Sequence, residues 1–307
     1  MNTINGPTKM TSNRPKPHIA GPMDYLKALP QYLLPHHPLS RLLSRLTHAR
    51  WAPLKNFLIR GFSRIYHIRL DEAASSEPAD YEHFNAFFTR ALKPGVRPLA
   101  GGDKLVVSPV DGTVSQCGLI KDGRIFQAKG RSYSTRELLG GDPRLAELFE
   151  DGEFATIYLS PTDYHRIHMP LDGTLQEMVH VPGRLFSVSP ATTRVIPGLF
   201  ARNERVVTVF ETEAGPMAMV LVGAIFVASI ETVWGGVITP PAGKKLRNWD
   251  YRGADQPTVL AKGEEMGRFN MGSTVVLLFP KGRCQWDPVA THGTHLRLGQ
   301  AIGRLPA

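Results

Sequence analysis

Cysteine is scarce in this chain: its 307 residues include only Cys117 and Cys284, which lie far apart and in no spacing typical of metal ligands. Two such residues do not form a disulfide framework, and this favours a reducing compartment. The sequence also lacks a run of about 18 uncharged apolar residues, the length that a membrane-spanning helix needs. Neither a disulfide-stapled domain nor a membrane-spanning protein is therefore expected.

Acidic residues are nearly missing from the first 70 positions. That stretch holds 11 Lys and Arg residues against one acid, Asp24, whereas the other 237 residues hold 25 basic and 26 acidic groups. The net charge of +9 therefore arises entirely at the N-terminus. A catalytic body that bound nucleic acid would carry basic residues of its own, so nucleic acid is not an expected partner. The asymmetry indicates an N-terminal segment that meets an anionic surface.

The first 95 residues divide into a tail and a helical region. Residues 1–22 are rich in Pro, Asn, Thr and Lys and lack an apolar run, which predicts a flexible tail and not a secretory signal peptide. Within residues 23–95, two stretches carry apolar side chains at helical spacing: Leu39, Leu42, Leu43 and Leu46, then Leu54, Phe57, Leu58, Phe62 and Ile65.

Two interpretations of these amphipathic helices stay open. Their apolar faces could pack on the body of the protein. Alternatively, they could lie in a membrane interface, with the leucines and phenylalanines at the acyl boundary and the arginines on anionic headgroups. The shortage of acids favours the membrane interpretation, although an Arg-rich, acid-poor composition also fits a transit peptide.

The rest of the chain reads as β-rich. The 29 Gly and 25 Pro residues imply many turns. A helical pattern around residues 81–92 ends before Pro94, and strand patterns follow at 104–107, 113–116, 156–159, 173–181, 206–211 and 273–279. The long apolar run 217–230 is expected to be buried on both faces or bent at Gly223. The predicted fold class is α+β, with a β-rich catalytic domain (96–307) behind an N-terminal amphipathic helical region (23–95).

The residues most suited to chemistry cluster in the segment 158–170. His165 and His168 are three apart, so on a helical turn they would share a face. They supply two of the ligands that zinc needs, and Asp111 is a candidate third. A second histidine pair, His292 and His295, lies in a Gly-rich tail and reads as a solvated loop.

Asp111 and Ser273 carry weak signals when taken alone. Asp111 stands in an Asp-Gly pair, which is typical of turns, and Ser273 follows glycine at the start of a strand pattern. Asp111, His168 and Ser273 could form an Asp–His–Ser relay, but such a relay is recognised by geometry and not by spacing.

At these residues the sequence resembles the phosphatidylserine decarboxylase family of the proteobacterial type, from about Tyr25 to about Phe279. The matching stretches, in family order, are Phe84–Arg90, Pro109–Gly112, Ala128–Gly130, Tyr158–Pro170, Leu199–Arg205, Gly223–Ala224, Ser229–Trp234 and Glu265–Phe269. The family's processing motif Leu-Gly-Ser-Thr reads Met-Gly-Ser-Thr here, at 271–274. Methionine keeps the volume and apolar character of leucine, so processing is expected.

The resemblance implies a self-cleaving proenzyme. Ser273 would attack the Gly272 carbonyl, with His168 as general base oriented by Asp111. The products would be a β chain of residues 1–272 and an α chain of residues 273–307 that begins with a pyruvoyl group and stays associated with it.

The resemblance also implies the reaction. The pyruvoyl ketone would form a Schiff base with phosphatidylserine and act as an electron sink for decarboxylation to phosphatidylethanolamine, with His165 as the acid that reprotonates carbon. No metal is implied. The expected location is peripheral, on the cytoplasmic face of the bacterial cell membrane, where the basic N-terminus meets anionic phospholipid. Family members often form dimers, which makes a homodimer an expectation.

Three other classes compete with this interpretation. A serine hydrolase built on Asp111, His168 and Ser273 would leave the chain intact, but Ser273 lacks a Gly-x-Ser-x-Gly context. A metal-dependent hydrolase using His165 and His168 would lose its activity on chelation. A basic membrane- or nucleic-acid-binding module would not need the acid–base groups clustered in the near-neutral body.

Overall fold

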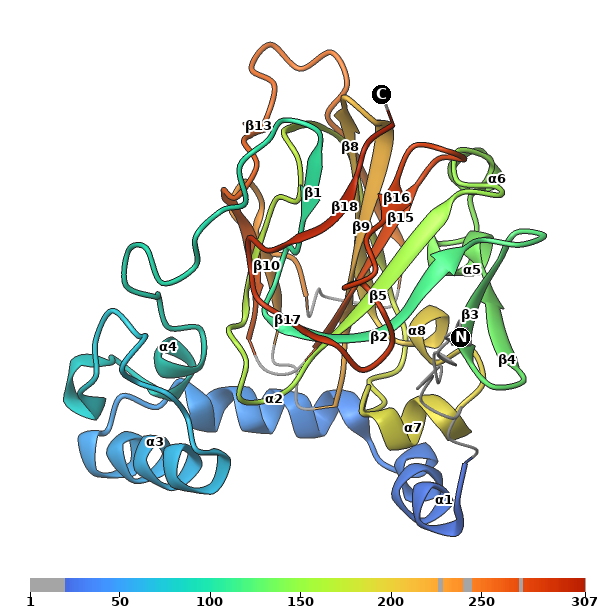
Figure 1. The fold of residues 1–307 in the computed structure, drawn as a ribbon. Coiled ribbons are helices and arrows are strands. Elements are labelled where there is room, and N and C mark those ends of the chain that lie inside the picture. The colour runs from blue at the N-terminus through green and yellow to red at the C-terminus, as the bar shows by residue number, and fades with distance from the viewer. Residues whose placement is uncertain (1–19, 226–228, 240–244, 271–272, 307) are drawn as a thin grey trace, which may run out of the picture.

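The computed structural model describes residues 20–225, 229–239, 245–270 and 273–306. Its helices lie mainly at the N-terminal end of the chain and its strands in the rest, which confirms the α+β class (Figure 1). The helices are α1 (Pro22–Ala28), η1 (Leu29–Tyr32), α2 (His36–Thr47), α3 (Ala52–Tyr66), η2 (Pro78–Asp80), α4 (Phe84–Phe88), α5 (Thr135–Leu138), α6 (Pro143–Glu147), α7 (Pro190–Val195) and α8 (Leu199–Arg202).

A nine-stranded antiparallel sheet forms the centre of the molecule. Its strands follow the order β12 (Arg247–Asp250), β7 (Gly173–Val181), β8 (Arg205–Thr212), β9 (Gly215–Gly223), β15 (Ser273–Phe279), β5 (Glu153–Leu159), β2 (Gly112–Leu119) and β17 (His295–Leu296), with β13 (Val259–Leu260) also paired to β7. The run Ser-Thr-Val-Val-Leu-Leu-Phe of β15 is buried along its whole length. Such an unbroken apolar run suits a strand that has neighbours on both edges and is covered on both faces.

Three smaller sheets complete the β structure. They are β1 (Leu105–Val107), β18 (Ala301–Arg304) and β16 (Gln285–Trp286); β11 (Gly236–Val237), β10 (Ile230–Thr232), β14 (Glu265–Phe269) and β6 (Arg166–His168); and the hairpin β3 (Arg124–Ala128) with β4 (Arg131–Ser134). The second of these brings β6 beside β14, so the segment with the two histidines lies against a distant part of the chain.

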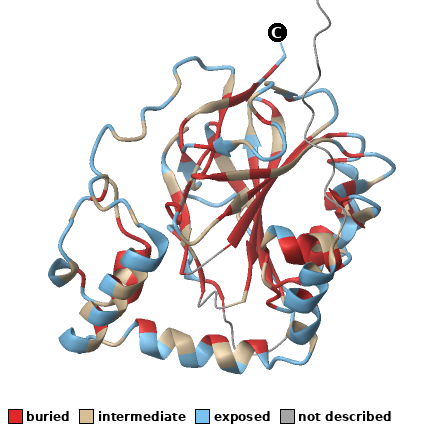
Figure 2. Ribbon diagram, turned by 60° about the horizontal axis from the view of Figure 1, so that its bottom comes forward, coloured by how far each residue is buried: buried red, intermediate tan, exposed pale blue. Residues whose placement is uncertain are grey.

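Helix α2 turns its polar face towards the protein. The residues that it buries are His36, Ser40 and Thr47, whereas Leu42 is 64% exposed and Leu46 is also exposed. Figure 2 shows the contrast between this helix and the buried strands of the sheet. The apolar face that the sequence pattern predicts is therefore divided: Leu39 and Leu43 are half-buried, whereas Leu42 and Leu46 are exposed.

Helices α3 and α4 share a small apolar core of their own. Ile59 of α3 packs in this core with Tyr81 and with three aromatic residues of α4: Phe84, Phe87 and Phe88. The last of these also contacts the larger domain, because the ring of Phe88 stacks on His165 with ring centroids 4.1 Å apart. One short helix thus joins the N-terminal region to the segment 158–170.

Several predicted elements have the observed bounds and others do not. Strands β7 and β15 match the predictions 173–181 and 273–279 in full. The helix expected around 81–92 is reduced to α4, which ends well before Pro94. In the apolar run 217–230 the strand ends at Gly223, as a bend there predicts. Most of the tail 1–22 lies outside the described residues, so the proposed domain boundaries stay predictions.

Candidate active site

Ser273 opens the central strand β15. It is in register with Leu159 of β5 on one side and with Gly223 of β9 on the other. Its side chain is fully buried, and its Oγ has no hydrogen-bond partner, a feature shared by the hydroxyl of Thr274. An unsatisfied buried hydroxyl costs about 1–3 kcal/mol, and such groups call for an explanation, often a functional one.

His165 is also fully buried, and neither of its ring nitrogens has a hydrogen-bond partner. The ring lies flat against Phe88, with 24° between the ring planes. Burial, with a further contribution from the charge of Arg90, lowers the pKa of His165 to about 3. The imidazole is therefore neutral near pH 7; a backbone contact with Ser160 opposes the shift in pKa but does not cancel it.

His168 lies at the end of strand β6, so the helical turn considered for the two histidines is wrong. Strand geometry points residues three apart to opposite faces, and this explains why the two rings have different surroundings. His168 Nδ1 lies 2.8 Å from the carbonyl oxygen of Gly263, and Nε2 lies 3.3 Å from the hydroxyl of Tyr164.

These contacts fix the tautomer of His168. A carbonyl oxygen only accepts, so Nδ1 carries the proton and Nε2 accepts from Tyr164. Burial raises the pKa of Tyr164 to about 12, which keeps its hydroxyl protonated. Burial also lowers the pKa of His168. His168 is thus held as a neutral ring whose Nε2 can take a proton.

Asp111 is held by an arginine. Arg97 Nε donates to both oxygens of its carboxylate, at 2.8 and 3.0 Å, and the backbone N–H of Leu298 donates to one of them at 2.7 Å. No hydrogen bond joins Asp111 to His168 among the described residues, although the backbone N–H of His168 donates to the carbonyl of Pro109, two residues before Asp111, at 2.9 Å. The histidine and the carboxylate are placed near each other, but the relay is not assembled.

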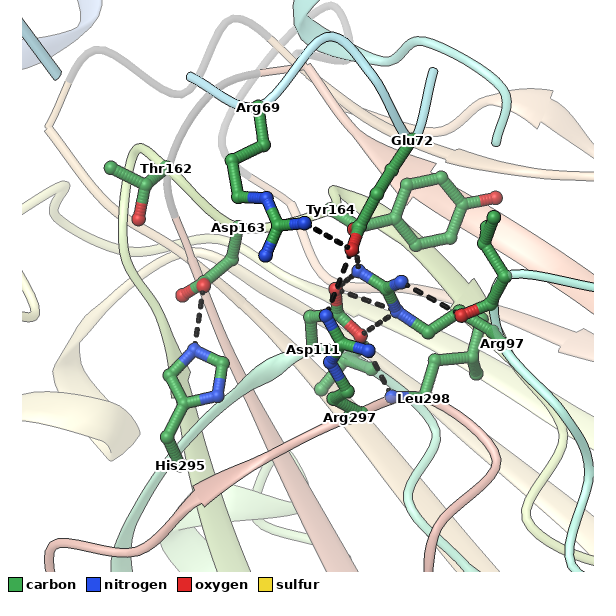
Figure 3. Close-up of polar contacts among 12 residues, drawn as sticks. Arg69, Glu72, Arg97, Asp111, Thr162, Asp163, Tyr164, His295, Arg297 and Leu298 are labelled. Atoms are coloured by element: carbon green, nitrogen blue, oxygen red, sulfur yellow. Dashed lines mark hydrogen bonds and ion pairs between the residues drawn. The ribbon is translucent and has the colours of Figure 1, made fainter. Parts of the chain in front are cut away.

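An ion-pair cluster around Asp111 was not expected from the sequence. Arg97 also pairs with Glu72 at 2.8 Å, and Arg297 and Arg69 pair with the same carboxylate at 2.8 and 3.4 Å (Figure 3). The charge of Asp111 raises the pKa of Arg97. These residues come from three distant parts of the chain and belong to no short motif, so no local signal in the sequence could reveal them.

His292 and His295, the second pair noted in the sequence, each have a contact of their own. His295 Nε2 lies 3.0 Å from a carboxylate oxygen of Asp163, and His292 Nδ1 contacts the carbonyl of Ser115. Both histidines are exposed, but His295 opens strand β17, so the loop prediction is wrong for that residue. Among the described residues, no group of three His, Cys, Asp or Glu side chains is arranged to hold a metal ion.

Fold and site together define an α+β protein with a buried, unpartnered serine, a buried neutral histidine, a second, half-buried histidine and an arginine-held carboxylate. Comparison with known proteins gives the family. Residues 84–304 match the family model described as phosphatidylserine decarboxylase, and residues 26–67 match a second model described as PSD. The chain belongs to the phosphatidylserine decarboxylase family.

Its curated relatives extend over nearly the whole chain. The phosphatidylserine decarboxylase proenzyme of Shewanella loihica is 57% identical over 286 residues, which cover 92% of this chain and 100% of the relative. The proenzyme of Azotobacter vinelandii is 56% identical, with 92% and 98% covered. That of Vibrio cholerae is 53% identical, with 91% and 98% covered.

Proposed function

We propose that this chain decarboxylates phosphatidylserine to phosphatidylethanolamine with a pyruvoyl group made from its own Ser273. The observation that carries the proposal is the Ser273 hydroxyl, which is buried, lacks a partner and opens a central strand. The relatives' names supply the substrate, and the word proenzyme in them fits a chain that must be cut.

Maturation balances without an added oxidant. Ser273 Oγ attacks the carbonyl carbon of Gly272, a residue outside the described ranges, and His168 Nε2 takes the hydroxyl proton. The amide becomes an ester with a free Ser273 amine. Elimination removes the Ser273 α-proton and breaks the Cβ–O bond, which leaves Gly272 as a carboxylate. Hydrolysis of the resulting dehydroalanine consumes one water and releases ammonia. The product is an N-terminal pyruvoyl group.

Position 273 fits such a group. The Ser273 hydroxyl forms no hydrogen bond that its conversion would break, and the flanking strands β5 and β9 hold the backbone on both sides. When present, the group supplies an electron-withdrawing carbonyl that accepts the electron pair left behind as carbon dioxide departs.

We assign proton delivery to His165. Its buried, neutral ring holds one proton, which it can give to the carbon that lost carbon dioxide. The ring of Phe88 fixes its plane. His168, whose Nε2 is prepared as an acceptor, is assigned to maturation with Asp111.

The α and β chains are proposed to remain associated after the cut. Seven residues of β15 pair with β5 and six pair with β9, and all of these lie on the C-terminal side of residue 272. The α chain therefore keeps a central strand of the nine-stranded sheet, hydrogen-bonded along both edges.

The N-terminal helices are proposed to bind the anionic surface of the bacterial cell membrane on its cytoplasmic face. Twelve of the twenty large apolar side chains that the described chain exposes lie in the short stretch from Met23 to Tyr66. The arginines Arg41 and Arg45 are exposed on α2 beside its outward leucines. No helix among the described residues is long and apolar enough to cross a bilayer. An apolar face with flanking arginines suits binding in the interface plane.

Intact mass spectrometry under denaturing conditions tests the proposal. We expect two chains divided between Gly272 and Ser273, the smaller one lighter than a serine-started fragment by the difference between serine and pyruvoyl. Ser273→Ala is the control and should give one uncut chain. An uncut wild-type chain that decarboxylates phosphatidylserine, or a cut chain with an ordinary N-terminal serine, would refute the pyruvoyl assignment.

A second experiment separates the two histidines. We expect His165→Ala to be cut normally and to lose turnover, and His168→Ala to remain uncut. Loss of cutting in the His165 variant would reverse the assigned roles. The readouts are the fraction of cut chain on a denaturing gel and the release of carbon dioxide from phosphatidylserine.

A further inference from the structure

Arg90 is a buried arginine that forms no ion pair with the described residues, although the charges of Asp111 and Asp163 act on it from a distance. Its side chain lies just beyond α4 and the residue is 5% exposed. Its Nε has no hydrogen-bond partner, and its only hydrogen bond is a long one, 3.4 Å from NH2 to the carbonyl of Thr162. The guanidinium also lies over the ring of Phe87, 5.7 Å from the centroid. A buried cation left in this way is costly unless an anion joins it.

Burial alone does not leave an arginine in this state, as Arg205 demonstrates. This residue is also buried, but Nε donates to the carbonyl of Leu138 at 2.6 Å and NH1 to that of Asn203 at 2.8 Å. A third carbonyl, that of Glu137, accepts from NH2. The fold thus satisfies the donors of one buried arginine with its own backbone and leaves those of the other available.

Arg90 lines a cleft of about 460 Å³ that also reaches Asp111, Tyr164 and Asp163. Three other arginines line the cleft, and each of them is in an ion pair: Arg69, Arg97 and Arg297. The carboxylate of Asp163 accepts from the backbone and hydroxyl of Ser160 and contacts His295. Of these four arginines, Arg90 is the one that is buried and forms no ion pair with the described residues.

We propose that Arg90 binds the phosphate of the phospholipid headgroup; this rests on the proposed function. A guanidinium presents paired N–H donors that match phosphate oxygens. A membrane phospholipid that carries serine offers two anionic groups, its phosphate and its carboxylate. The carboxylate loses its charge as carbon dioxide leaves, so an arginine fixed on it would stabilise the ground state more than the transition state. The phosphate keeps its charge throughout, and it is the better ligand for a fixed cation.

The position of Arg90 supports this role. Phe87 carries the guanidinium on its face, and the next residue, Phe88, carries the ring of His165. The charge of Arg90 is felt at His165, whose pKa it lowers. One short segment therefore places an anion-binding group and the proposed proton donor close together, which sets the headgroup in place relative to the reacting carbon.

Binding to the uncut chain is the direct test, because it needs no turnover and avoids reaction of an amine with the pyruvoyl group. We would titrate Ser273→Ala and Ser273→Ala/Arg90→Gln with glycerophosphoethanolamine, which has the phosphate but no carboxylate, and follow phosphorus NMR. Loss of a charged hydrogen-bond donor should weaken binding about tenfold or more. The exposed Arg124, which contacts Ser132 of the same hairpin, supplies the control substitution Arg124→Gln, expected to change nothing.

L-Serine distinguishes the two anionic groups, since it has the carboxylate but no phosphate. We would titrate L-serine itself into the same two proteins; if the Arg90 variant loses binding of L-serine and keeps that of glycerophosphoethanolamine, Arg90 serves the carboxylate and the phosphate assignment is overturned. Equal binding of glycerophosphoethanolamine with and without Arg90 overturns the proposal entirely. The proposed function fails separately, when the wild-type chain is not cut or does not decarboxylate.

Kinetic constants and thermal stability give a second, independent test of the role of Arg90. In the cut enzyme, Arg90→Gln should raise KM for phosphatidylserine about tenfold and change kcat much less, with partial recovery in Arg90→Lys. Removing an unpaired buried charge should leave the melting temperature unchanged or raise it, whereas Arg205→Gln should lower it. A fall in melting temperature for Arg90→Gln with an unchanged KM would show a purely structural residue.

Discussion

Helix α2 and strand β15 are both rich in leucine and related apolar residues, but the molecule uses them in opposite ways. Every residue of β15 is buried, whereas α2 buries His36, Ser40 and Thr47 and exposes Leu42 and Leu46. An apolar pattern shows that a face avoids water, and it does not show what covers that face. In β15 the cover is the rest of the domain. In α2 it is, on our proposal, the acyl boundary of a membrane.

The largest effect should come from a leucine of the strand. Leu277 is fully buried in β15, so Leu277→Ala should lower the free energy of unfolding by about 2–5 kcal/mol through lost apolar contact and a cavity. Leu42→Ala makes the same chemical change at an exposed position and should shift stability by less than about 0.5 kcal/mol. Denaturant unfolding of uncut Ser273→Ala protein measures both. Equal losses would show that α2 packs on the body in solution.

Buried histidines extend the comparison. His36 of α2 accepts the backbone N–H of Leu185 through Nδ1, whereas His165 has no partner and a pKa of about 3. Because the folded pKa lies below the ordinary value of 6.5, the unfolded chain binds more protons between these values, and stability falls as pH drops from about 6.5 towards 3. His165→Gln should remove up to about 1.4 kcal/mol per pH unit of this dependence. An unaltered pH profile of unfolding would show that His165 is not held neutral.

The outward leucines should matter for membranes in proportion to the area they bury there. Leu42→Ala should weaken binding to anionic vesicles by roughly tenfold, because a fully buried leucine side chain is worth about 1.5–3 kcal/mol. Leu148, an exposed leucine beside α6, gives the control substitution Leu148→Ala, which should leave vesicle binding unchanged. Sedimentation with vesicles measures the binding of both variants, each made in the Ser273→Ala protein. Equal effects from the two leucines would argue against an α2 anchor.

The smallest effect should come from the charges beside those leucines. Arg45→Gln should cost about 1 kcal/mol of binding to anionic vesicles and leave binding to neutral ones almost unchanged. The loss should shrink as salt is added, since exposed charges are screened. A salt-independent loss would mean that Arg45 acts through packing and not through charge.

The sequence predicted elements well wherever one local pattern decided the outcome. Strands β7 and β15 could be placed to the residue because their apolar runs are bounded by turn-forming residues. The helix expected around residues 81–92 was too long. Its aromatic residues form a compact core with α3, and the residues after Phe88 are not helical and line the cleft.

The site was predictable only in part. Ser273, His165 and His168 stood out through motif and resemblance, and their catalytic roles remain predictions. The ion pairs of Arg97 with Asp111 and with Glu72 could not be predicted, because they join residues that are 14 and 25 positions apart and share no motif. The sequence also did not show which leucines of α2 are exposed. Helical periodicity predicts an apolar face, but not what that face packs against.

If the chain cuts itself as we propose, the two-sided pairing of β15 has a consequence for the lifetime of the mature enzyme. Before the cut, folding is a property of one molecule and unfolding can be reversed by the same chain. After the cut, a central strand of the sheet belongs to a second molecule, so recovery from unfolding requires an encounter between two pieces, and the melting temperature of cut protein should rise with its concentration. On this proposal, self-cleavage makes unfolding harder to reverse. The proenzyme can refold alone, whereas the mature enzyme persists mainly because it unfolds slowly.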